Sequence, residues 1–358
     1  MKAEIAIVGG GLAGWALAEA LLRQGVDPAQ MLLLEARVTG AGASGLPLGL
    51  LHPFPGRSLY PRPGYLAAWR QSQSWLSRLS TSDAGRLFQS LPLWRLAFDP
   101  ATAGRFERSY LRALAELSDY PLLSLSDTGV LTALTGFCLP DAALVDMPRL
   151  LARLRSCAPI QTRSHSGPLQ LQRRGRDWVL QSDSNSCLAS QVVLAVGCGL
   201  NVYFPELPLI PDRGEIAIFD LDAELPAAVS AAGQYLAPLG AGRMITGSTH
   251  YRAECALPPG QAWQTLRAGL DWLPGIRSAR LIQIWTGTRL GSQDREPLVG
   301  AVPGQPGLWL LGAFATRGLL QIPTAAEALA QELLRAEVWI PEAMRAERFD
   351  AALWALTD

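Results

Sequence analysis

The chain has 358 residues, of which 49% are hydrophobic and 17% charged; this balance excludes a disordered or fibrous protein and predicts one large or two smaller folded domains. Its 31 basic and 31 acidic residues cancel, so the composition gives no sign of a polyanionic partner such as nucleic acid. Five scattered cysteines argue against a zinc site or a disulfide framework. Because no stretch has the roughly 18 apolar residues of a membrane span, we expect a cytoplasmic protein.

The N-terminal segment carries a dinucleotide-binding pattern. A strand is predicted over Glu4–Val8 and a helix over Leu12–Leu22, joined by a Gly-x-Gly-x-x-Gly turn. Gly9 allows the tight turn, Gly11 lets backbone N–H groups approach a pyrophosphate, and Gly14 lets the helix pack on the strand. A second strand ends at Glu35, about 20 residues later, where an acid binds a ribose hydroxyl. The pattern indicates NAD or FAD but does not separate the two.

Further elements follow in chain order. The loop 39–58 is rich in Gly, Ala and Pro, so its backbone can lie against a flat ligand. Helices are predicted over 64–79, 104–117, 146–156, 260–273 and 324–335. Strands are predicted over 168–174, 177–182, 191–199, 214–220, 234–240, 243–249 and 308–312. Two apolar segments with turn residues lie at 91–99 and 127–134.

This order predicts a discontinuous α/β Rossmann-like domain combined with a second, antiparallel substrate domain. Its bounds are 1–78, 139–212 and 284–358 for the nucleotide domain and 79–138 and 213–283 for the substrate domain. NAD-binding domains are usually contiguous, whereas two-domain FAD enzymes are interleaved in this way, so the organisation favours FAD.

Four segments of the sequence resemble the D-amino acid oxidase superfamily of FAD-dependent oxidoreductases. They are "IAIVGGGLAGWALAEALLRQG", "GASGLPLGLLHP", "VVLAVGCG", and "WTGTRLGSQDREPLVG" continued by "GLWLLGAFATRGLLQIPTAAEALA". Within the superfamily the chain is most similar to glycine oxidase and to the flavin domain of the bifunctional enzyme that makes methylaminomethyl-thiouridine in tRNA. "PDRGEIA" and "ATRGLLQIP" are especially similar to the second branch.

The resemblance implies FAD and a set of cofactor-binding residues. Those for the ADP half are Gly9, Gly11, Leu12, Ala13, Gly14, Glu35 and Ala36, with Ala195 and Gly197 on the adenine–ribose side. Those along the pyrophosphate and ring are Ala43, Ser44, Gly45 and Gly49, and those at the ribityl and ring end are Gly312, Arg317, Gly318 and Leu319. Arg317 and the helix N-terminus beyond it would stabilise an anionic reduced ring, unless Arg317 is an exposed loop residue.

The flavin is expected to be non-covalent. Relatives with a histidyl-linked flavin carry a histidine where this chain has Leu46 or Pro47, and no cysteine lies near the C-terminal flavin motif.

The resemblance also implies substrate residues. Arg289 matches the arginine that binds the substrate carboxylate in glycine oxidase-like enzymes. An arginine suits this role because its guanidinium fork holds a carboxylate bidentately. The alternative is a salt bridge to Asp294 or Glu296. Tyr235 matches a pocket tyrosine, or else packs in the core, and His52 follows the loop that contacts the ring.

Other candidates are weaker. His52 and His250 are each interpreted more readily as turn or strand residues than as catalysts, and His165 receives no role. The arginines at 173, 174 and 176 form a solvated hairpin tip.

We therefore expect an FAD-dependent oxidase or dehydrogenase that acts on the C–N bond of a small amine or amino acid. The amine enters neutral, its α-carbon gives a hydride to flavin N5, the imine hydrolyses, and oxygen or another acceptor takes the electrons. No side-chain base is required, which agrees with the lack of an obvious catalytic His–Asp pair. Two alternatives stay open: a tRNA wobble-uridine modification flavoenzyme that removes a carboxymethyl group, and a non-catalytic flavoprotein. Binding of nucleic acid by the chain is not expected.

Overall fold

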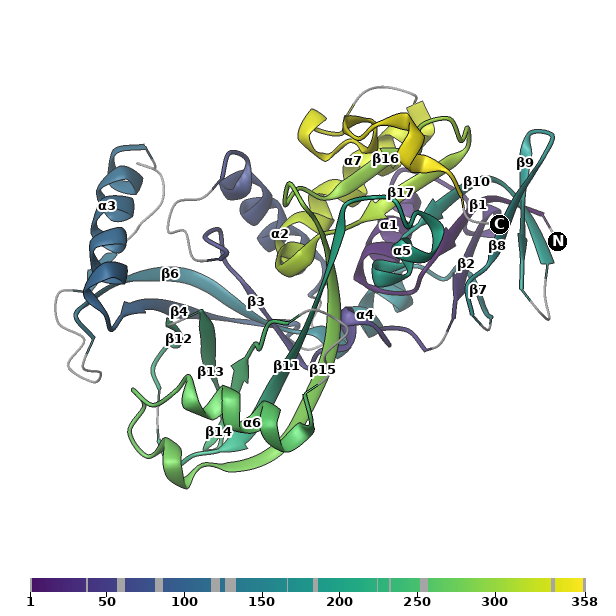
Figure 1. Ribbon diagram of the computed structural model, residues 1–358. Helices are drawn as coiled ribbons and strands as arrows, with labels where there is room; N and C mark the ends of the chain where they lie inside the picture. Colours follow the sequence, from purple (N-terminus) through teal and green to yellow (C-terminus); the bar gives the residue numbers. More distant parts are fainter. Residues whose placement is uncertain are drawn as a thin grey trace.

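The computed structural model describes residues 2–36, 38–56, 62–80, 86–116, 123–125, 133–165, 167–182, 186–223, 225–231, 233–251, 257–335 and 339–356. It is a mixed α/β fold built on two sheets (Figure 1). The first sheet lies at the right of the view, beside both ends of the chain, and the second at the left and bottom. In the described residues, no helix has the length and apolar character needed to cross a membrane.

The first sheet contains the predicted nucleotide-binding strands. Its strands are β1 (Lys2–Val8), β2 (Met31–Glu35), β7 (Gln161–Ser164), β8 (Gln170–Arg174), β9 (Asp177–Gln181), β10 (Ser186–Leu194), β16 (Leu298–Ala301) and β17 (Leu308–Gly312). Their order is β16-β17-β10-β1-β2-β7, with the β8–β9 hairpin paired to β10. β1 runs parallel to β2 and β10, so the predicted strand–helix–strand unit is confirmed. The predicted hairpin is confirmed as well.

The second sheet is mainly antiparallel. Its strands are β3 (Leu48–Leu51), β4 (Phe88–Ala97), β5 (Leu123–Leu125), β6 (Thr135–Asp146), β11 (Leu209–Asp220), β12 (Ala228–Ala231), β13 (Gln234–Gly240), β14 (Arg243–Gly247) and β15 (Arg280–Ser292). The order is β15-β11-β14-β13-β12-β4-β6-β3, with β5 beside β6. β6 was not predicted, and most of the apolar segment 127–134 lies outside the described residues.

Seven helices in the described residues cover these sheets: α1 (Leu12–Arg23), α2 (Tyr65–Leu79), α3 (Pro100–Glu116), α4 (Met147–Cys157), α5 (Leu200–Tyr203), α6 (Pro259–Ala268) and α7 (Gly318–Arg335). The helix start predicted near residue 146 is confirmed, because the Asp146 side chain accepts the Arg149 N–H at 2.9 Å. α1 and α7 pack together against the first sheet, with α2 beside α7 (Figure 1).

Two helix bounds differ from the prediction. α6 ends at Ala268 rather than Leu273. The Gln234 amide donates to the Leu266 carbonyl at 2.8 Å. A further helical turn would donate a backbone N–H to this same carbonyl. α7 begins at Gly318 rather than Thr324, with Pro323 inside it. A proline signals a helix start in sequence, but here it lies in the second turn.

The two faces of the second sheet have different neighbours. Leu93, Ala97, Ile216 and Ile245 join the large core shared with α1, α2 and α7. Residues of the opposite face pack with Leu270 and Leu273 beyond α6. The first of these faces therefore looks toward the nucleotide-binding half.

The predicted domain bounds stay a proposal. The divisions at 138/139, 212/213 and 283/284 fall inside β6, β11 and β15, all strands of the second sheet. β3 also belongs to this sheet although it lies within the range 1–78. Sheet membership therefore divides the chain at somewhat different residues from the predicted domain bounds.

Candidate active site

The glycine turn after β1 is closed by direct backbone contacts. Gly9 has φ +112°, and a Cβ there would lie 2.4 Å from the Ala195 carbonyl oxygen. A Cβ at Gly14 would lie 2.0 Å from the Gly9 carbonyl oxygen. Neither position admits a side chain, so the turn, α1 and the end of β10 meet as the nucleotide-binding pattern requires.

Two predicted cofactor residues from other segments bind this turn. Gly10 N–H donates to Glu35 Oε2 at 2.6 Å, and Leu12 N–H donates to Ser44 Oγ at 2.9 Å. Ser44 belongs to a short 3-10 turn, Ala43–Gly45, and its hydroxyl lies over Gly11, where a Cβ would be 3.2 Å from Oγ. The structure therefore gathers Glu35, Ser44 and Gly11 at the N-terminus of α1. The partial positive charge of this helix N-terminus favours an anionic ligand.

The loop after β2 joins this turn to the C-terminal motif. A Cβ at Gly45 would lie 2.1 Å from the Gly40 carbonyl oxygen, and one at Gly49 would lie 2.2 Å from Leu319 Cδ1. Gly49 and Leu319, predicted from segments far apart in the sequence, are therefore in contact. The loop, β3 and the first turn of α7 form one continuous wall.

Arg317 is buried, so the alternative of an exposed loop arginine is wrong. Its Nη1 donates to the Tyr65 hydroxyl at 3.2 Å and its Nη2 donates to the Arg295 carbonyl. Its Nε has no partner among the described residues, and neither amide atom of the buried Gln321 has one. Buried polar groups are normally paired, so unsatisfied atoms in and beside the first turn of α7 suit a polar ligand such as the flavin.

Gly312 and Gly197 are not required by protein contacts. A Cβ at Gly312 would meet only Leu200 Cδ2, at an ordinary 3.8 Å, and one at Gly197 would meet nothing within 4 Å. Gly197 has φ +56°, which itself favours glycine, but Gly312 is not in that region. At Gly312, the space that a side chain would fill remains available to a ligand.

The substrate candidates lie on one face of the second sheet. Residues opposite each other in register share a face, and so do residues two apart on a strand. The register runs from Arg95 through Ser230, Tyr235, Gly247 and Ile216 to Trp285. Gly287 and Arg289 follow Trp285 on the same face of β15, and a Cβ at Gly287 would lie 3.6 Å from Ala43 Cα. This face therefore abuts the predicted cofactor loop.

Tyr235 lies across a glycine of the neighbouring strand. A Cβ at Gly247 would be 3.2 Å from Tyr235 Cε1. Burial raises the pKa of Tyr235 well above its ordinary value, although the charge of Arg289 acts in the opposite direction. The phenol therefore keeps its proton and is available as a hydrogen-bond donor.

Arg289 is paired, but not with either predicted partner. Its Nη2 lies 2.9 Å from Asp212 Oδ2, directly across β11 and β15. Asp294 instead pairs with Arg348 at 2.6 Å, and Glu296 pairs with Arg62. The alternative of a salt bridge at Arg289 is therefore correct, but its partner is neither Asp294 nor Glu296.

His250 completes a cluster around Arg289. His250 Nδ1 lies 3.0 Å from Asp212 Oδ2 and 3.3 Å from Arg289 Nη2. Ser248 Oγ accepts from Arg289 Nη1 at 3.2 Å and lies 3.3 Å from His250 Nε2. Burial opposes ionisation of Asp212, but hydrogen bonding with His250 and the charge of Arg289 lower its pKa overall. The structure thus forms a His–Asp pair that the sequence did not reveal.

His52 is a neutral residue next to a buried cation. Burial, followed by the charge of Arg95, lowers the pKa of His52 from 6.5 to about 3. Its Nδ1 accepts the Phe54 N–H at 3.2 Å, which leaves the ring proton on Nε2. The geometry makes His52 a donor rather than a general base at neutral pH.

Arg95 was not predicted as a site residue, although it is a buried charge on the sheet face that carries Tyr235 and Arg289. It donates to the carbonyls of Phe54 and Gly56 at 2.7 Å each, and burial lowers its pKa to about 10. The available signal was an arginine at an inward position of an apolar strand, flanked on the same face by Leu93 and Ala97. Asp212 and Ser248 gave no such signal, because both lie in polar segments.

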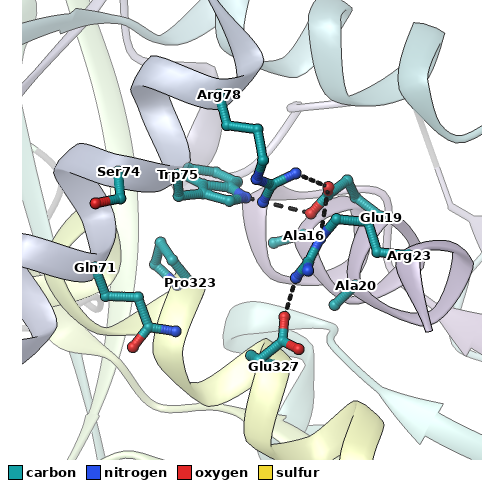
Figure 2. A pocket seen from close by; sticks show the side chains of 10 residues that line it. All are labelled: Ala16, Glu19, Ala20, Arg23, Gln71, Ser74, Trp75, Arg78, Pro323 and Glu327. Atoms are coloured by element: carbon teal, nitrogen blue, oxygen red, sulfur yellow. Dashed lines mark hydrogen bonds and ion pairs between the residues drawn. The ribbon is translucent and has the colours of Figure 1, made fainter.

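A separate cavity of about 300 Å³ lies between α1, α2 and α7 (Figure 2). Glu19 accepts hydrogen bonds there from Arg23, Arg78 and Trp75, and Arg23 also pairs with Glu327. The four charges balance, and none of the predicted site residues lines this cavity. It is best explained as an ion-pair cluster that joins the helices. The described residues contain no cluster of three or more metal-ligating side chains.

Comparison with known proteins supports FAD as the cofactor. The family model "FAD dependent oxidoreductase" matches residues 4–332. The chain is 29% identical over 333 residues to a tRNA 5-methylaminomethyl-2-thiouridine biosynthesis bifunctional protein from Maricaulis maris, covering 92% of this chain but 52% of that one. The chain therefore spans about half the length of this relative. It is 28% identical to a glycine oxidase from Pseudomonas aeruginosa, over 92% of this chain and 94% of that one.

Solved structures share the fold over nearly the whole chain. Glycine oxidase from Geobacillus kaustophilus has a TM-score of 0.80 at 21% identity, covering 99% of this chain and 98% of that one. Iminodiacetate oxidase from Chelativorans sp. BNC1 has a TM-score of 0.78 at 19% identity, covering 96% and 98%. The glycine turn, the acid at the end of β2 and the extent of these matches lead to one conclusion: the chain belongs to the D-amino acid oxidase family of FAD-dependent oxidoreductases and is an enzyme whose cofactor is FAD.

Proposed function

We propose that this enzyme oxidises the C–N bond of a small amine or amino acid whose carboxylate binds Arg289. One observation carries the proposal: Arg289 shares a sheet face with Tyr235, and Gly287 on that face packs against Ala43 of the cofactor loop. A substrate held by Arg289 would therefore lie beside the predicted flavin-binding wall. The glycine oxidase relative supports the same substrate class.

The residues would divide the work as follows. Arg289 binds the substrate carboxylate and so fixes the direction of the α-C–H bond. Tyr235 offers its protonated phenol as a hydrogen-bond donor. Arg317 and the first turn of α7 provide positive potential at the flavin-ring end of the site. Bound FAD supplies the two-electron acceptor for a hydride from the α-carbon. The imine product would be hydrolysed by water, and oxygen or another acceptor would take the two electrons.

The cofactor residues named from the sequence are part of this proposal. Gly9, Gly14, Glu35 and Ser44 meet around the N-terminus of α1. The flavin is proposed to be held without a covalent bond, so heat should release free FAD into solution.

An anaerobic amine panel tests the proposal. Glycine, N-methylglycine and related amines are mixed with the holoenzyme, and bleaching of the flavin absorbance is followed. Arg289→Gln should keep FAD but lose roughly 100-fold in the second-order rate of bleaching by the best carboxylate-bearing amine, because a charge-assisted bidentate contact is lost. Arg280→Gln is the matched control, since Arg280 pairs with Asp220 at the far end of the same strand. Equal loss in both variants would contradict the role of Arg289.

The second candidate is removal of a carboxymethyl group from a modified wobble uridine in tRNA by the same amine oxidation. It is favoured by the similarity to the bifunctional tRNA enzyme over 92% of this chain. The charges favour it less. The hairpin residue Arg173 donates to two backbone carbonyls and lies over Trp178, and the net charge of the chain is zero. We therefore rank a free small amine first.

A further inference from the structure

The carboxylate-binding residue already faces a carboxylate, an observation that gains its meaning from the proposed function. Asp212 Oδ2 lies 2.9 Å from Arg289 Nη2, and the two residues are register partners across β11 and β15. Their side chains are 27% and 17% exposed, so water only partly screens the pair. In this arrangement Asp212 neutralises the charge that a substrate carboxylate needs.

Asp212 also has a second partner. His250 Nδ1 lies 3.0 Å from Asp212 Oδ2 and 3.3 Å from Oδ1. The opposite ring nitrogen, Nε2, lies 3.3 Å from Ser248 Oγ, which can accept a hydrogen bond from it. A protonated His250 can thus donate to Asp212 through Nδ1 and to Ser248 through Nε2, and it would then balance the charge of Asp212 in place of Arg289.

The charges around the cluster leave this role to His250. On β11 the neighbouring Arg213 approaches Glu215 at 4.0 Å, and Glu215 is buried and accepts from Thr249. From β13, Tyr235 presents a neutral phenol, and from β15, Arg289 presents a permanent cation. Among the described groups that face Asp212, His250 is the imidazole, which can hold a second ring proton and then donate through both ring nitrogens.

We propose that Asp212 competes with the substrate carboxylate for Arg289, and that protonated His250 takes over Asp212 when a carboxylate binds. Without the proton, an incoming carboxylate meets a second negative charge beside Arg289, which weakens binding. With the proton, the cluster holds two cations and two carboxylates. Carboxylate binding is therefore coupled to uptake of one proton and weakens as pH rises.

Acetate is a suitable probe, because it carries the carboxylate and cannot be oxidised as an amine. The holoenzyme is titrated with acetate at constant ionic strength, binding is followed by the shift of the flavin spectrum, and acetamide serves as the uncharged control. Proton uptake is measured by calorimetry in two buffers of different ionisation enthalpy. The wild type should take up close to one proton and bind acetate more weakly at higher pH.

Variants separate this proposal from a structural role. Asp212→Asn should bind acetate about tenfold more tightly than the wild type, with little dependence on pH, because the competing charge is gone. Asp212→Glu keeps the charge and should keep weak binding. His250→Gln cannot take the proton, so its binding should be weak at every pH and without proton uptake. Asp212→Ser provides the same test if the asparagine variant does not retain FAD.

Two results would overturn the proposal: acetate binding to Asp212→Asn that is no tighter than to the wild type, or wild-type binding without proton uptake. Arg289→Gln distinguishes this failure from failure of the proposed function. If Arg289→Gln binds acetate as the wild type does, Arg289 is not the carboxylate site and the proposed function loses its main support.

Discussion

At the scale of single residues, the glycines predicted to bind the cofactor include two groups. Gly9 and Gly14 cannot accept a Cβ because backbone atoms occupy its place. Gly312 can accept one, since its nearest neighbour would be at van der Waals distance. The first group is explained by the fold alone, whereas the contacts of Gly312 leave room for a ligand to approach its backbone. This difference can be measured.

Gly312→Ala should leave the apoprotein as stable as the wild type and weaken FAD binding by at least tenfold, because the new methyl group occupies ligand space. Thermal unfolding with and without added FAD measures both quantities. Gly260→Ala, at an open position in α6, is the control for FAD binding and should leave the FAD affinity unchanged. Unchanged FAD affinity in Gly312→Ala would remove this residue from the cofactor site.

His52 should make the protein sensitive to acid. Its pKa is about 3 when folded and near 6.5 when unfolded. Between these values the unfolded chain binds the extra proton, so stability falls as pH drops from about 6.5 to about 3. His52→Asn removes this contribution, so the variant should lose less stability than the wild type over that window in denaturant titrations followed by tryptophan fluorescence. His165→Asn is the control, and parallel losses in both variants would contradict the assignment.

At the scale of elements, the sequence predicted the nucleotide-binding unit well because its signals are local. Strand, turn, helix and acid follow within one short segment, and Gly9 and Gly14 are required because backbone atoms occupy the place of a Cβ. The missed features depend on distant partners. β6 contains Pro140 and Asp141, and the register between β4 and β6 shifts between Leu91 and Leu93, around Pro92. The pairing of Asp212 with Arg289 requires the register of two strands that are distant in sequence.

One contact that sequence patterns do not show joins the early part of α7 to α2. The hydroxyl of Ser72, fully buried in α2, donates to the Leu320 carbonyl at 3.1 Å, in the turn that precedes Pro323. Ser72→Ala should lower the free energy of unfolding by about 1 kcal/mol, because this carbonyl loses its side-chain donor. Ser74→Ala, on the exposed side of the same helix, should change it by less than about 0.5 kcal/mol. Urea unfolding compares the two, and equal effects would contradict a role for the Ser72 bond.

At the scale of the whole molecule, the two sheets meet where the chemistry is proposed. The first sheet presents the glycine turn and the C-terminal motif, and the second presents the face that carries Tyr235 and Arg289. Family membership and FAD follow from the whole-chain match, but the substrate depends on a few side chains on this face. Sequence alone identified the arginine, whereas the charges that surround it became visible only once the strands were paired.

The most direct test of the central claim is anaerobic reduction of the bound flavin by two kinds of substrate. The holoenzyme is mixed separately with a panel of glycine-like amines and with tRNA that carries the carboxymethylaminomethyl group, and the loss of flavin absorbance is timed. We predict rapid bleaching by a free small amine and weak tRNA binding, since a tRNA reader loses affinity steeply with salt, with a log–log slope of roughly −0.7 to −0.9 per phosphate contact. Rapid bleaching by the tRNA, with none by any free amine, would contradict the account.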